Sequence, residues 1–300
     1  MNQPDTTPKD GPNHILQTLF VGLQYLLPHH LLSSVMHGIA RIELKPVKDL
    51  LIRQAINWYK VDMEEALQND PRQYRSFNDF FTRALQPDAR PFTQEENQVA
   101  APADGTLSRA GDIESGFLLQ AKGHDYSLLE LLGGDPEMNQ LFEDGNFATI
   151  YLSPRDYHRV HMPVNGRLRR MVHVPGRLFS VNATTCRKVP RLFARNERVI
   201  SLFDTAFGPM AIILVGAIFV SSIETVWAGT ITPKRQQTNK WDYQQQDKPT
   251  PVELAKGEEM GRFNMGSTVI MLFARDAVEW LEDFTAGSTV RMGQAVGEKC

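Results

Sequence analysis

Residues 263–273 read FNMGSTVIMLF, a Gly-Ser-Thr triplet at the start of an apolar run rich in β-branched side chains. Such a run is typical of a buried strand. Ser267 directly follows Gly266, and glycine has the least restricted backbone of any residue type. This arrangement suits a nucleophile that attacks its own preceding peptide bond. The same triplet is also an ordinary turn into a strand, and it recurs at 287–289, so it cannot identify a function alone.

Strand and turn patterns dominate the chain from residue 99 onward. Residues 147–152 predict a strand, and residues 165–181 and 199–226 continue in alternating or fully apolar strand patterns. The most apolar run, 210–220, has 11 residues. Because about 20 apolar residues are needed to cross a bilayer, this run predicts one or two buried strands.

Two other segments interrupt the strand patterns. Residues 127–132 predict a short helix that ends at Gly133 and Gly134. Residues 229–261 are polar with little apolar periodicity, and they lead directly to Ser267. A long segment of this kind is often functional or mobile.

Four segments before residue 95 predict helices. They cover residues 15–27, 31–44, 47–67 and 77–85. Pro28 ends the first helix, and Ser76 is a candidate N-cap for the last. The composition changes near residue 95, where we place the boundary of the helical region.

Together these patterns predict an α+β fold, with N-terminal helices followed by a mainly β catalytic domain. The expected parts are a disordered leader over residues 1–14, a helical region over 15–95 and the β domain over 96–300. Two interpretations of the first two helices are open. They pack on the β domain, or they lie in a bilayer interface.

Composition and charge exclude several classes of protein. The 300 residues, 42% of them hydrophobic, are enough to bury a sizeable core. A net charge of −3 argues against a general nucleic-acid binder. Cys186 and Cys300 provide neither a disulfide framework nor a paired metal spacing. The polar N-terminus lacks the positive charge of a signal peptide, and no transmembrane helix is evident.

Two further stretches carry residues suited to catalysis. Residues 102–105, PADG, place Asp104 in a tight turn. Residues 151–163, YLSPRDYHRVHMP, contain His158 and His161, which share a face of a helix but diverge in an extended chain. Histidine is the natural proton carrier near neutral pH. No nearby Cys or acidic residue completes a metal-ligand set, so we expect no metal.

In their order, these stretches resemble the phosphatidylserine decarboxylase family in its bacterial, pyruvoyl-dependent form. The matching stretches are PADG at 102–105, QAKGHDYSL at 120–128, YLSPRDYHRVHMP at 151–163 and GST at 266–268. The likeness covers most of residues 15–295. The family's last motif is usually Leu-Gly-Ser-Thr, whereas Met265 stands here, an apolar residue of similar volume.

The resemblance implies a proenzyme that cleaves itself between Gly266 and Ser267. The family's Asp-His-Ser set corresponds to Asp104, His161 and Ser267, in which the histidine takes the hydroxyl proton and the aspartate orients its ring. Ser267 then becomes a covalent pyruvoyl group, the implied cofactor. The implied reaction decarboxylates phosphatidylserine to phosphatidylethanolamine and CO₂ through a Schiff base, with His158 as proton donor or substrate-positioning group.

The resemblance also implies partners and a location. The partners are phosphatidylserine and the membrane surface, and the cleavage products 1–266 and 267–300 form a heterodimer. A homodimer of this pair stays open, and we expect no nucleic-acid partner. A lipid substrate favours membrane association of the helices at 15–27 and 31–44, in a peripheral protein on the cytoplasmic face of the cell (inner) membrane.

Two other functions are compatible with parts of the sequence. A Ser-His-Asp hydrolase would keep Ser267 as a stable nucleophile in one uncleaved chain. A non-catalytic, membrane-associated β domain would leave Asp104, His158, His161 and Ser267 without a purpose.

Overall fold

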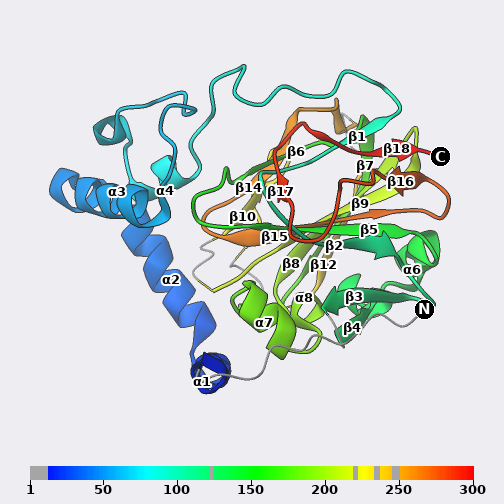
Figure 1. The fold of residues 1–300 in the computed structure, drawn as a ribbon, viewed down its shortest axis with the longest axis horizontal. Helices are drawn as coiled ribbons and strands as arrows, with labels where there is room; N and C mark the ends of the chain where they lie inside the picture. Colours follow the sequence, from blue (N-terminus) through cyan, green and yellow to red (C-terminus); the bar gives the residue numbers. More distant parts are fainter. Residues whose placement is uncertain (1–12, 122–123, 219–221, 233–236, 245–250) are drawn as a thin grey trace.

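The computed structural model describes residues 13–121, 124–218, 222–232, 237–244 and 251–300 (Figure 1). The helices are α1 (Asn13–Leu26), α2 (His29–Ala40), α3 (Lys45–Tyr59), α4 (Phe77–Phe81), α5 (Leu128–Leu131), α6 (Pro136–Phe142), α7 (Ala183–Lys188) and α8 (Leu192–Arg195), with a 3-10 turn at Pro71–Gln73.

The strands of the first two thirds of the chain are β1 (Gln98–Ala100), β2 (Gly105–Asp112), β3 (Phe117–Ala121), β4 (His124–Ser127), β5 (Asn146–Leu152), β6 (Arg159–His161), β7 (Gly166–Val174) and β8 (Arg198–Thr205). The later strands are β9 (Gly208–Val215), β10 (Ile223–Thr225), β11 (Gly229–Thr230), β12 (Asn239–Asp242), β13 (Glu253–Leu254), β14 (Glu259–Phe263), β15 (Ser267–Phe273), β16 (Val278–Trp280), β17 (Thr289–Val290) and β18 (Ala295–Lys299). The predicted α+β class is confirmed, because helices α1 to α4 precede a mainly β body (Figure 1).

Helices α1 and α2 extend along one side of the β body (Figure 1). They confirm the helices predicted at 15–27 and 31–44, although α2 already ends at Ala40, where the N–H of Arg41 donates to the carbonyl of Gly38. The leader predicted over residues 1–14 lies outside the described residues, apart from its last two positions, which begin α1. Within the described part of the chain, no helix has the length and apolar character needed to cross a membrane.

The next two predicted helices are shorter than the sequence suggested. Helix α3 ends at Tyr59, because Lys60 adopts the left-handed conformation with φ +56°. Ala66 and Leu85 then pair in an isolated β-bridge, so neither the end of the segment 47–67 nor the end of the segment 77–85 is helical. The predicted N-cap of α4 is confirmed: the Ser76 hydroxyl accepts from the N–H of Asp79 at 3.2 Å.

The largest sheet contains nine strands of the described residues, in the order β12-β7-β8-β9-β15-β5-β2-β17, with β13 paired to β7. Strand β15 lies at its centre and pairs antiparallel with β5 on one side and β9 on the other. All seven of its residues are buried. The buried strand predicted at 263–273 is therefore confirmed, but it begins only at Ser267, because the backbone turns at Met265 and Gly266.

Smaller sheets complete the body, in the orders β11-β10-β14-β6, β1-β18-β16 and β3-β4. The sheet with β6 and β14 positions the site, because β6 carries His161 and β14 leads into the Gly-Ser-Thr segment.

Most of the other strand predictions hold in part. Strand β5 matches the predicted strand at 147–152, and the segment 199–226 divides into β8, β9 and β10. The strand predicted over 165–181 ends at Val174. The helix predicted at 127–132 is α5, capped by the Ser127 hydroxyl. The described parts of the polar segment 229–261 contain β11, β12, β13 and β14, and its residues 233–236 and 245–250 lie outside the described ranges.

Candidate active site

Ser267 is the first residue of β15, and its side chain is completely buried. Its Oγ has no hydrogen-bond partner among the described residues. Main-chain pairing with Leu152 of β5 fixes its position in the sheet. A buried hydroxyl without a partner costs free energy, so the Ser267 hydroxyl is a candidate for a chemical role.

The backbone directly before Ser267 is strained. Met265 has φ +127° and Gly266 has φ +42°. Glycine adopts such angles freely, whereas a residue with a side chain pays about 1–3 kcal/mol for a sparsely populated conformation. A Cβ on Gly266 would meet no atom within 4 Å, so the positive φ, and not lack of space, requires glycine there. The strain lies next to the Gly266–Ser267 peptide bond.

Asn264 fixes this strained segment from its N-terminal side. Its Nδ2 donates to Ser222 Oγ at 2.5 Å and to Glu224 Oε1 at 2.7 Å. Its Oδ1 accepts from Nδ2 of Asn78, on α4, at 3.0 Å. The segment is thereby attached both to the β body and to the N-terminal helices.

His158 is fully buried just before β6. Its Nδ1 lies 2.7 Å from the carbonyl oxygen of Asp156. A carbonyl can only accept, so Nδ1 carries the proton and Nε2 keeps the lone pair. That Nε2 has no partner among the described residues. The ring lies against Phe81, with centroids 4.1 Å apart, and burial lowers the pKa of His158 to about 3, so the ring is neutral at pH 7.

His161 lies in extended β6, so the two histidines diverge instead of sharing a helical face. Its Nδ1 is 2.8 Å from the carbonyl oxygen of Gly257, and its Nε2 is 3.1 Å from the hydroxyl of Tyr157. By the same argument Nδ1 carries the proton, and Nε2 accepts from the tyrosine. Burial lowers the pKa of His161, which favours the neutral ring at pH 7.

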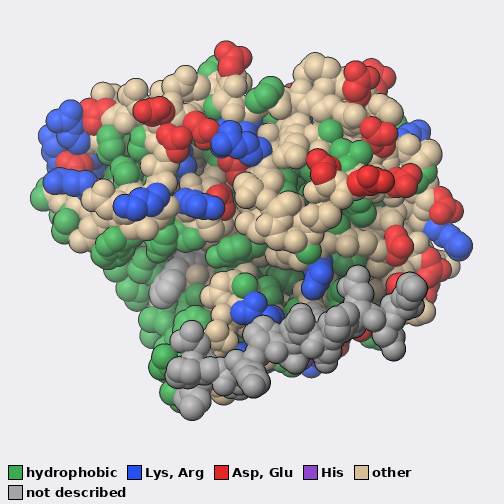
Figure 2. All heavy atoms as spheres, in the orientation of Figure 1, with side chains coloured by type: hydrophobic (Ala, Val, Ile, Leu, Met, Phe, Trp, Pro, Cys, Tyr) green, Lys and Arg blue, Asp and Glu red, His purple; other side chains and the backbone are tan. Residues whose placement is uncertain are grey.

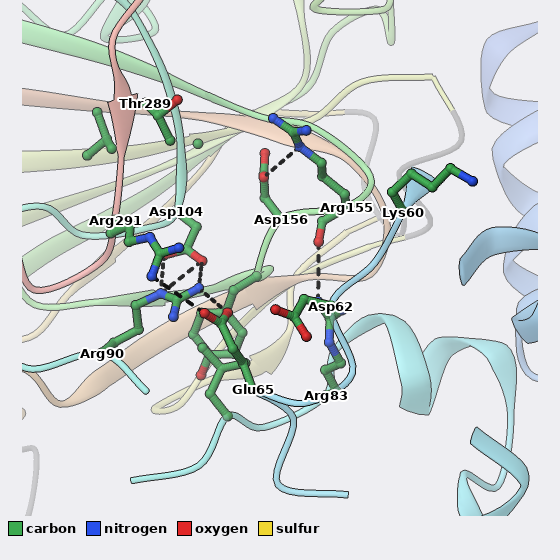
Figure 3. A pocket seen from close by; sticks show the side chains of 14 residues that line it. Lys60, Asp62, Glu65, Arg83, Arg90, Asp104, Arg155, Asp156, Thr289 and Arg291 are labelled. Carbon is green, nitrogen blue, oxygen red and sulfur yellow. Dashed lines mark hydrogen bonds and ion pairs between the residues drawn. The ribbon is translucent and has the colours of Figure 1, made fainter. Parts of the chain in front are cut away.

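Asp104 is buried and held by Arg90 (Figure 3). Arg90 Nε donates to Oδ1 at 2.9 Å, and Nη2 donates to Oδ2 at 2.7 Å. The N–H of Met292 donates to Oδ1 at 2.9 Å. Arg90 also donates to Glu65 at 2.7 Å, so one guanidinium joins two carboxylates.

The main chain brings the predicted site residues into one region. The N–H of His161 donates to the carbonyl of Pro102 at 2.8 Å, two residues before Asp104. The N–H of Phe263 donates to the carbonyl of His158 at 3.0 Å. The side chains of Asp104, His161 and Ser267 share no hydrogen bond among the described residues. The Asp-His-Ser relay therefore stays a prediction. Nor do three His, Cys, Asp or Glu side chains of the described residues cluster as metal ligands.

An apolar pocket of about 160 Å³ lies beside the segment that precedes Ser267. Met265 lines it together with residues of α2, α3 and α4. These include Met36, Ile39, Leu51, Trp58, Tyr59 and Phe77. The pocket connects the N-terminal helices to the candidate site.

Helices α1 and α2 expose an apolar surface. Figure 2 shows hydrophobic side chains gathered at its lower left, where Figure 1 places α1 and α2. Residues 13–40 contain no Asp, Glu, Lys or Arg. Leu16, Leu19, Leu23 and Leu26 of α1 are 55–83% exposed. The opposite side of α1 packs on the body: Val21 joins its core, and Gln24 exchanges hydrogen bonds with Ser180.

Several residues that hold the site together were missed from the sequence. Tyr157 and Asn264 lie inside the stretches that had been singled out, so their hydrogen-bonding side chains could have been named. Phe81 and Arg90 lie in segments without a motif. Their partners, His158 and Asp104, are far away in the sequence and are visible only in the fold.

Comparison with known proteins now identifies the class. A family model described as phosphatidylserine decarboxylase matches residues 77–298, and one described as PSD matches residues 19–60. The chain belongs to the phosphatidylserine decarboxylase family.

Curated relatives match the chain over nearly its whole length. It is 55% identical over 281 residues to the phosphatidylserine decarboxylase proenzyme of Ectopseudomonas mendocina (strain ymp), which covers 94% of this chain and 98% of that protein. It is 55% identical to the protein of the same name from Bordetella pertussis (strain Tohama I), over 93% of each chain. The Azotobacter vinelandii (strain DJ) proenzyme is 53% identical, over 93% of this chain and 98% of its own. None of these relatives supports the hydrolase alternative.

Proposed function

We propose that this chain is a proenzyme that cleaves itself between Gly266 and Ser267 and then decarboxylates phosphatidylserine to phosphatidylethanolamine and CO₂. The observation that carries the proposal is the position of Ser267. Its side chain is buried without a hydrogen-bond partner among the described residues, and a strained Met-Gly backbone precedes it, in a chain whose relatives are named proenzymes.

Self-cleavage rearranges the bonds around one peptide unit. Ser267 Oγ attacks the Gly266 carbonyl carbon, the amide C–N bond breaks, and an ester forms. Elimination releases the Gly266 carboxylate and leaves a double bond in residue 267. Water then replaces the nitrogen of residue 267, which leaves as ammonia, and a pyruvoyl group remains. Breaking the bond also releases the strain at Met265.

A serine hydroxyl needs a base to attack in this way. Nε2 of His161 carries the lone pair, and its neutral ring can take the Ser267 proton once Tyr157 releases it. A general base of this kind contributes roughly 10²–10⁴-fold. Glu259 and, to a smaller extent, Asp104 supply negative charge that favours the protonated ring, and Arg90 holds the Asp104 carboxylate in place.

A pyruvoyl group at residue 267 fits the surrounding residues, because Ser267 Oγ and His158 Nε2 are both buried and neither has a hydrogen-bond partner in the part of the chain that the structure describes. Such a group supplies a carbonyl that accepts the electron pair left behind by CO₂. The Nε2 lone pair of the neutral His158 ring accepts a hydrogen bond from the ammonium of the substrate and so positions it. As negative charge develops on the carbon that loses CO₂, that proton passes through Nε2 to this carbon. Both roles predicted for His158, positioning and proton donation, follow from this one atom.

The cleavage products 1–266 and 267–300 are proposed to stay together as a heterodimer. The smaller product contains β15, which lies between β5 and β9 at the centre of the largest sheet. It also contains β17 and β18, which pair with β2 and β1. Separating the two products would expose the buried side chains of β15 to water.

We propose a peripheral association with the membrane through the uncharged, exposed face of α1 and α2. The apolar pocket at Met265 then offers a route for a lipid chain from the bilayer to the site. The cytoplasmic face of the cell membrane is the location that the family resemblance implies.

The proposed function is tested with phosphatidylserine vesicles and the purified protein. We expect two chains on a denaturing gel, CO₂ release that depends on the lipid, and loss of activity after treatment with hydroxylamine, which reacts with carbonyl groups. A single chain that reacts with a fluorophosphonate, with no CO₂ release, would instead indicate the hydrolase.

A further inference from the structure

A polar pocket of about 270 Å³ opens beside Asp104 and Tyr157 (Figure 3). It is distinct from the apolar pocket at Met265, and the C-terminal end of α3 connects them. Trp58 and Tyr59 line the apolar pocket, and Lys60 lines the polar one. An amphiphile that enters from the N-terminal helices would therefore meet first the apolar pocket and then the polar one.

Arg83 is the unusual side chain of the polar pocket. It is only 5% exposed, yet no carboxylate of the described residues forms an ion pair with it. Among the described residues, its guanidinium makes one hydrogen bond, from Nη2 to the carbonyl of Arg155 at 3.2 Å, and its Nε has no partner. The face of Phe80 lies 5.6 Å away. A guanidinium has five N–H donors and stays protonated in proteins, so most of its hydrogen-bonding capacity is unused.

Other buried arginines of this chain show what a purely structural role looks like. Arg198, 2% exposed, donates to the carbonyls of Glu130, Leu131, Ala194 and Asn196. Arg90 is satisfied by Asp104, Glu65 and the carbonyl of Ala89. Because a buried charge without a counter-charge is costly, Arg83 indicates an anion that enters from the pocket.

Four acidic side chains line the pocket, Asp62, Glu65, Asp104 and Asp156, and each accepts a hydrogen bond. Asp62 Oδ1 accepts from the N–H of Glu64 at 2.8 Å and has no cationic partner among the described residues. Arg90 forms ion pairs with both Glu65 and Asp104, and Arg291 lies 3.5 Å from Glu65. Asp156 accepts from the N–H of Ser153 at 2.7 Å and lies 3.7 Å from Arg155. Lys60 and Arg155 add positive charge to the lining.

The pocket lies next to the proposed reaction centre. Phe81, two residues before Arg83, contacts the ring of His158, and Tyr157, which lines the pocket, is adjacent to that histidine. In phosphatidylserine, one ester oxygen and two carbon atoms separate the phosphorus from the amine. A substrate whose phosphate binds at Arg83 would therefore place its amine near His158.

We propose that Arg83 binds the phosphodiester group of phosphatidylserine, with Lys60 and Arg155 at the rim of the site; this inference rests on the proposed function. A phosphate fits better than the serine carboxylate. An arginine paired with the departing carboxylate would stabilise the ground state more than the transition state, since the carboxylate loses its charge as CO₂ leaves.

The test compares two substrates of the enzyme after self-cleavage, with both cleavage products present. One is phosphatidylserine, and the other is a long-chain O-alkyl serine, which has the same amino acid head without phosphate. We expect Arg83→Met to raise the KM for phosphatidylserine by about 10- to 100-fold, the loss typical of a charged hydrogen bond. The KM for the O-alkyl serine and the extent of self-cleavage should not change. The control, Arg72→Met, removes an exposed guanidinium outside the pocket and should change none of these values.

A second measurement uses the wild-type enzyme, in case Arg83→Met does not fold. Inorganic phosphate should inhibit competitively against phosphatidylserine, but not against the O-alkyl serine. Arg83→Lys, which keeps the charge, should weaken this inhibition. The inference is overturned by an unchanged KM in Arg83→Met, by equal rises for both substrates, or by the absence of phosphate competition. Failure of the proposed function would look different, because the wild-type enzyme itself would release no CO₂ from phosphatidylserine.

Discussion

Arg90 holds Asp104 through two guanidinium nitrogens, at 2.9 Å and 2.7 Å, in a part of the molecule where both side chains are buried. The pair joins the segment after the N-terminal helices to the turn before β2. Because a second carboxylate, Glu65, contacts the same guanidinium, Arg90 is the residue on which both acids depend.

The Arg90–Asp104 pair predicts a large stability effect. Arg90→Met leaves Asp104 buried without a counter-charge, and breaking a buried pair in this way costs about 3–5 kcal/mol. The free energy of unfolding should fall by that amount in urea denaturation. The measurement uses the Ser267→Ala background, so that each sample is one chain. The matched change Arg72→Met, at an exposed pair, should cost less than about 1 kcal/mol. Equal losses of unfolding free energy in the two variants would contradict a larger contribution from the buried pair.

The two histidines should separate the two reactions. His161→Ala removes the proposed base, so the chain should stay uncut on a denaturing gel. His158→Ala should still be cut, but should release no CO₂ from phosphatidylserine. Identical behaviour of the two variants would contradict this division of roles.

Burial of His158 predicts a dependence of stability on pH. Its pKa is lowered from an ordinary value near 6.5 to about 3, so the unfolded chain binds a proton that the folded chain does not. This stability contribution is complete above pH 6.5 and is lost as the pH falls toward 3. Between pH 7 and pH 5, the free energy of unfolding should drop less in His158→Gln than in the parent, both in the Ser267→Ala background. If the unfolding free energy of both proteins changed equally with pH, a buried neutral His158 would be excluded.

The exposed leucines of α1 should control membrane binding. Replacing Leu16, Leu19, Leu23 and Leu26 by Ser removes apolar area from the uncharged face. Since each fully buried leucine is worth about 1.5–3 kcal/mol, we expect liposome affinity to fall by at least about 100-fold in a sedimentation assay. As a control, Leu119→Ser with Val226→Ser changes exposed apolar residues elsewhere and should leave binding intact. Equal sedimentation of both variants would contradict docking through α1.

Local patterns in the sequence were enough to predict the fold class. Apolar β-branched runs predicted β5, β9 and β15. An apolar run ended by Pro28 predicted α1, and helical spacing predicted α2. Where the prediction failed, a tertiary contact prevailed over local preference. Residues after Tyr59 could have continued as a helix, but Lys60 turns the chain and Ala66 pairs with Leu85 instead. Pairings between distant segments do not show in local periodicity.

The motifs predict the residues of the site, which stay a prediction, but they do not predict the contacts that hold these residues. The motifs named Ser267, His158, His161 and Asp104, and the fold gathers them around β6 and β15. The motifs did not indicate that Asp104 pairs with Arg90, that His161 contacts Tyr157, or that Met265 is strained. Arg83 lay in a segment predicted only as a helix. That it is buried without an ion pair to any described carboxylate is visible only in the fold.

The most direct test of self-cleavage at Ser267 is the intact mass of the purified protein, beside that of Ser267→Ala. We predict two chains for the wild-type protein, residues 1–266 and residues 267–300. The smaller one should begin with a pyruvoyl group and lack the α-amine of serine. Ser267→Ala should give one uncut chain of 300 residues. A wild-type protein that stays whole, or a small chain that begins with an intact serine, would contradict the account.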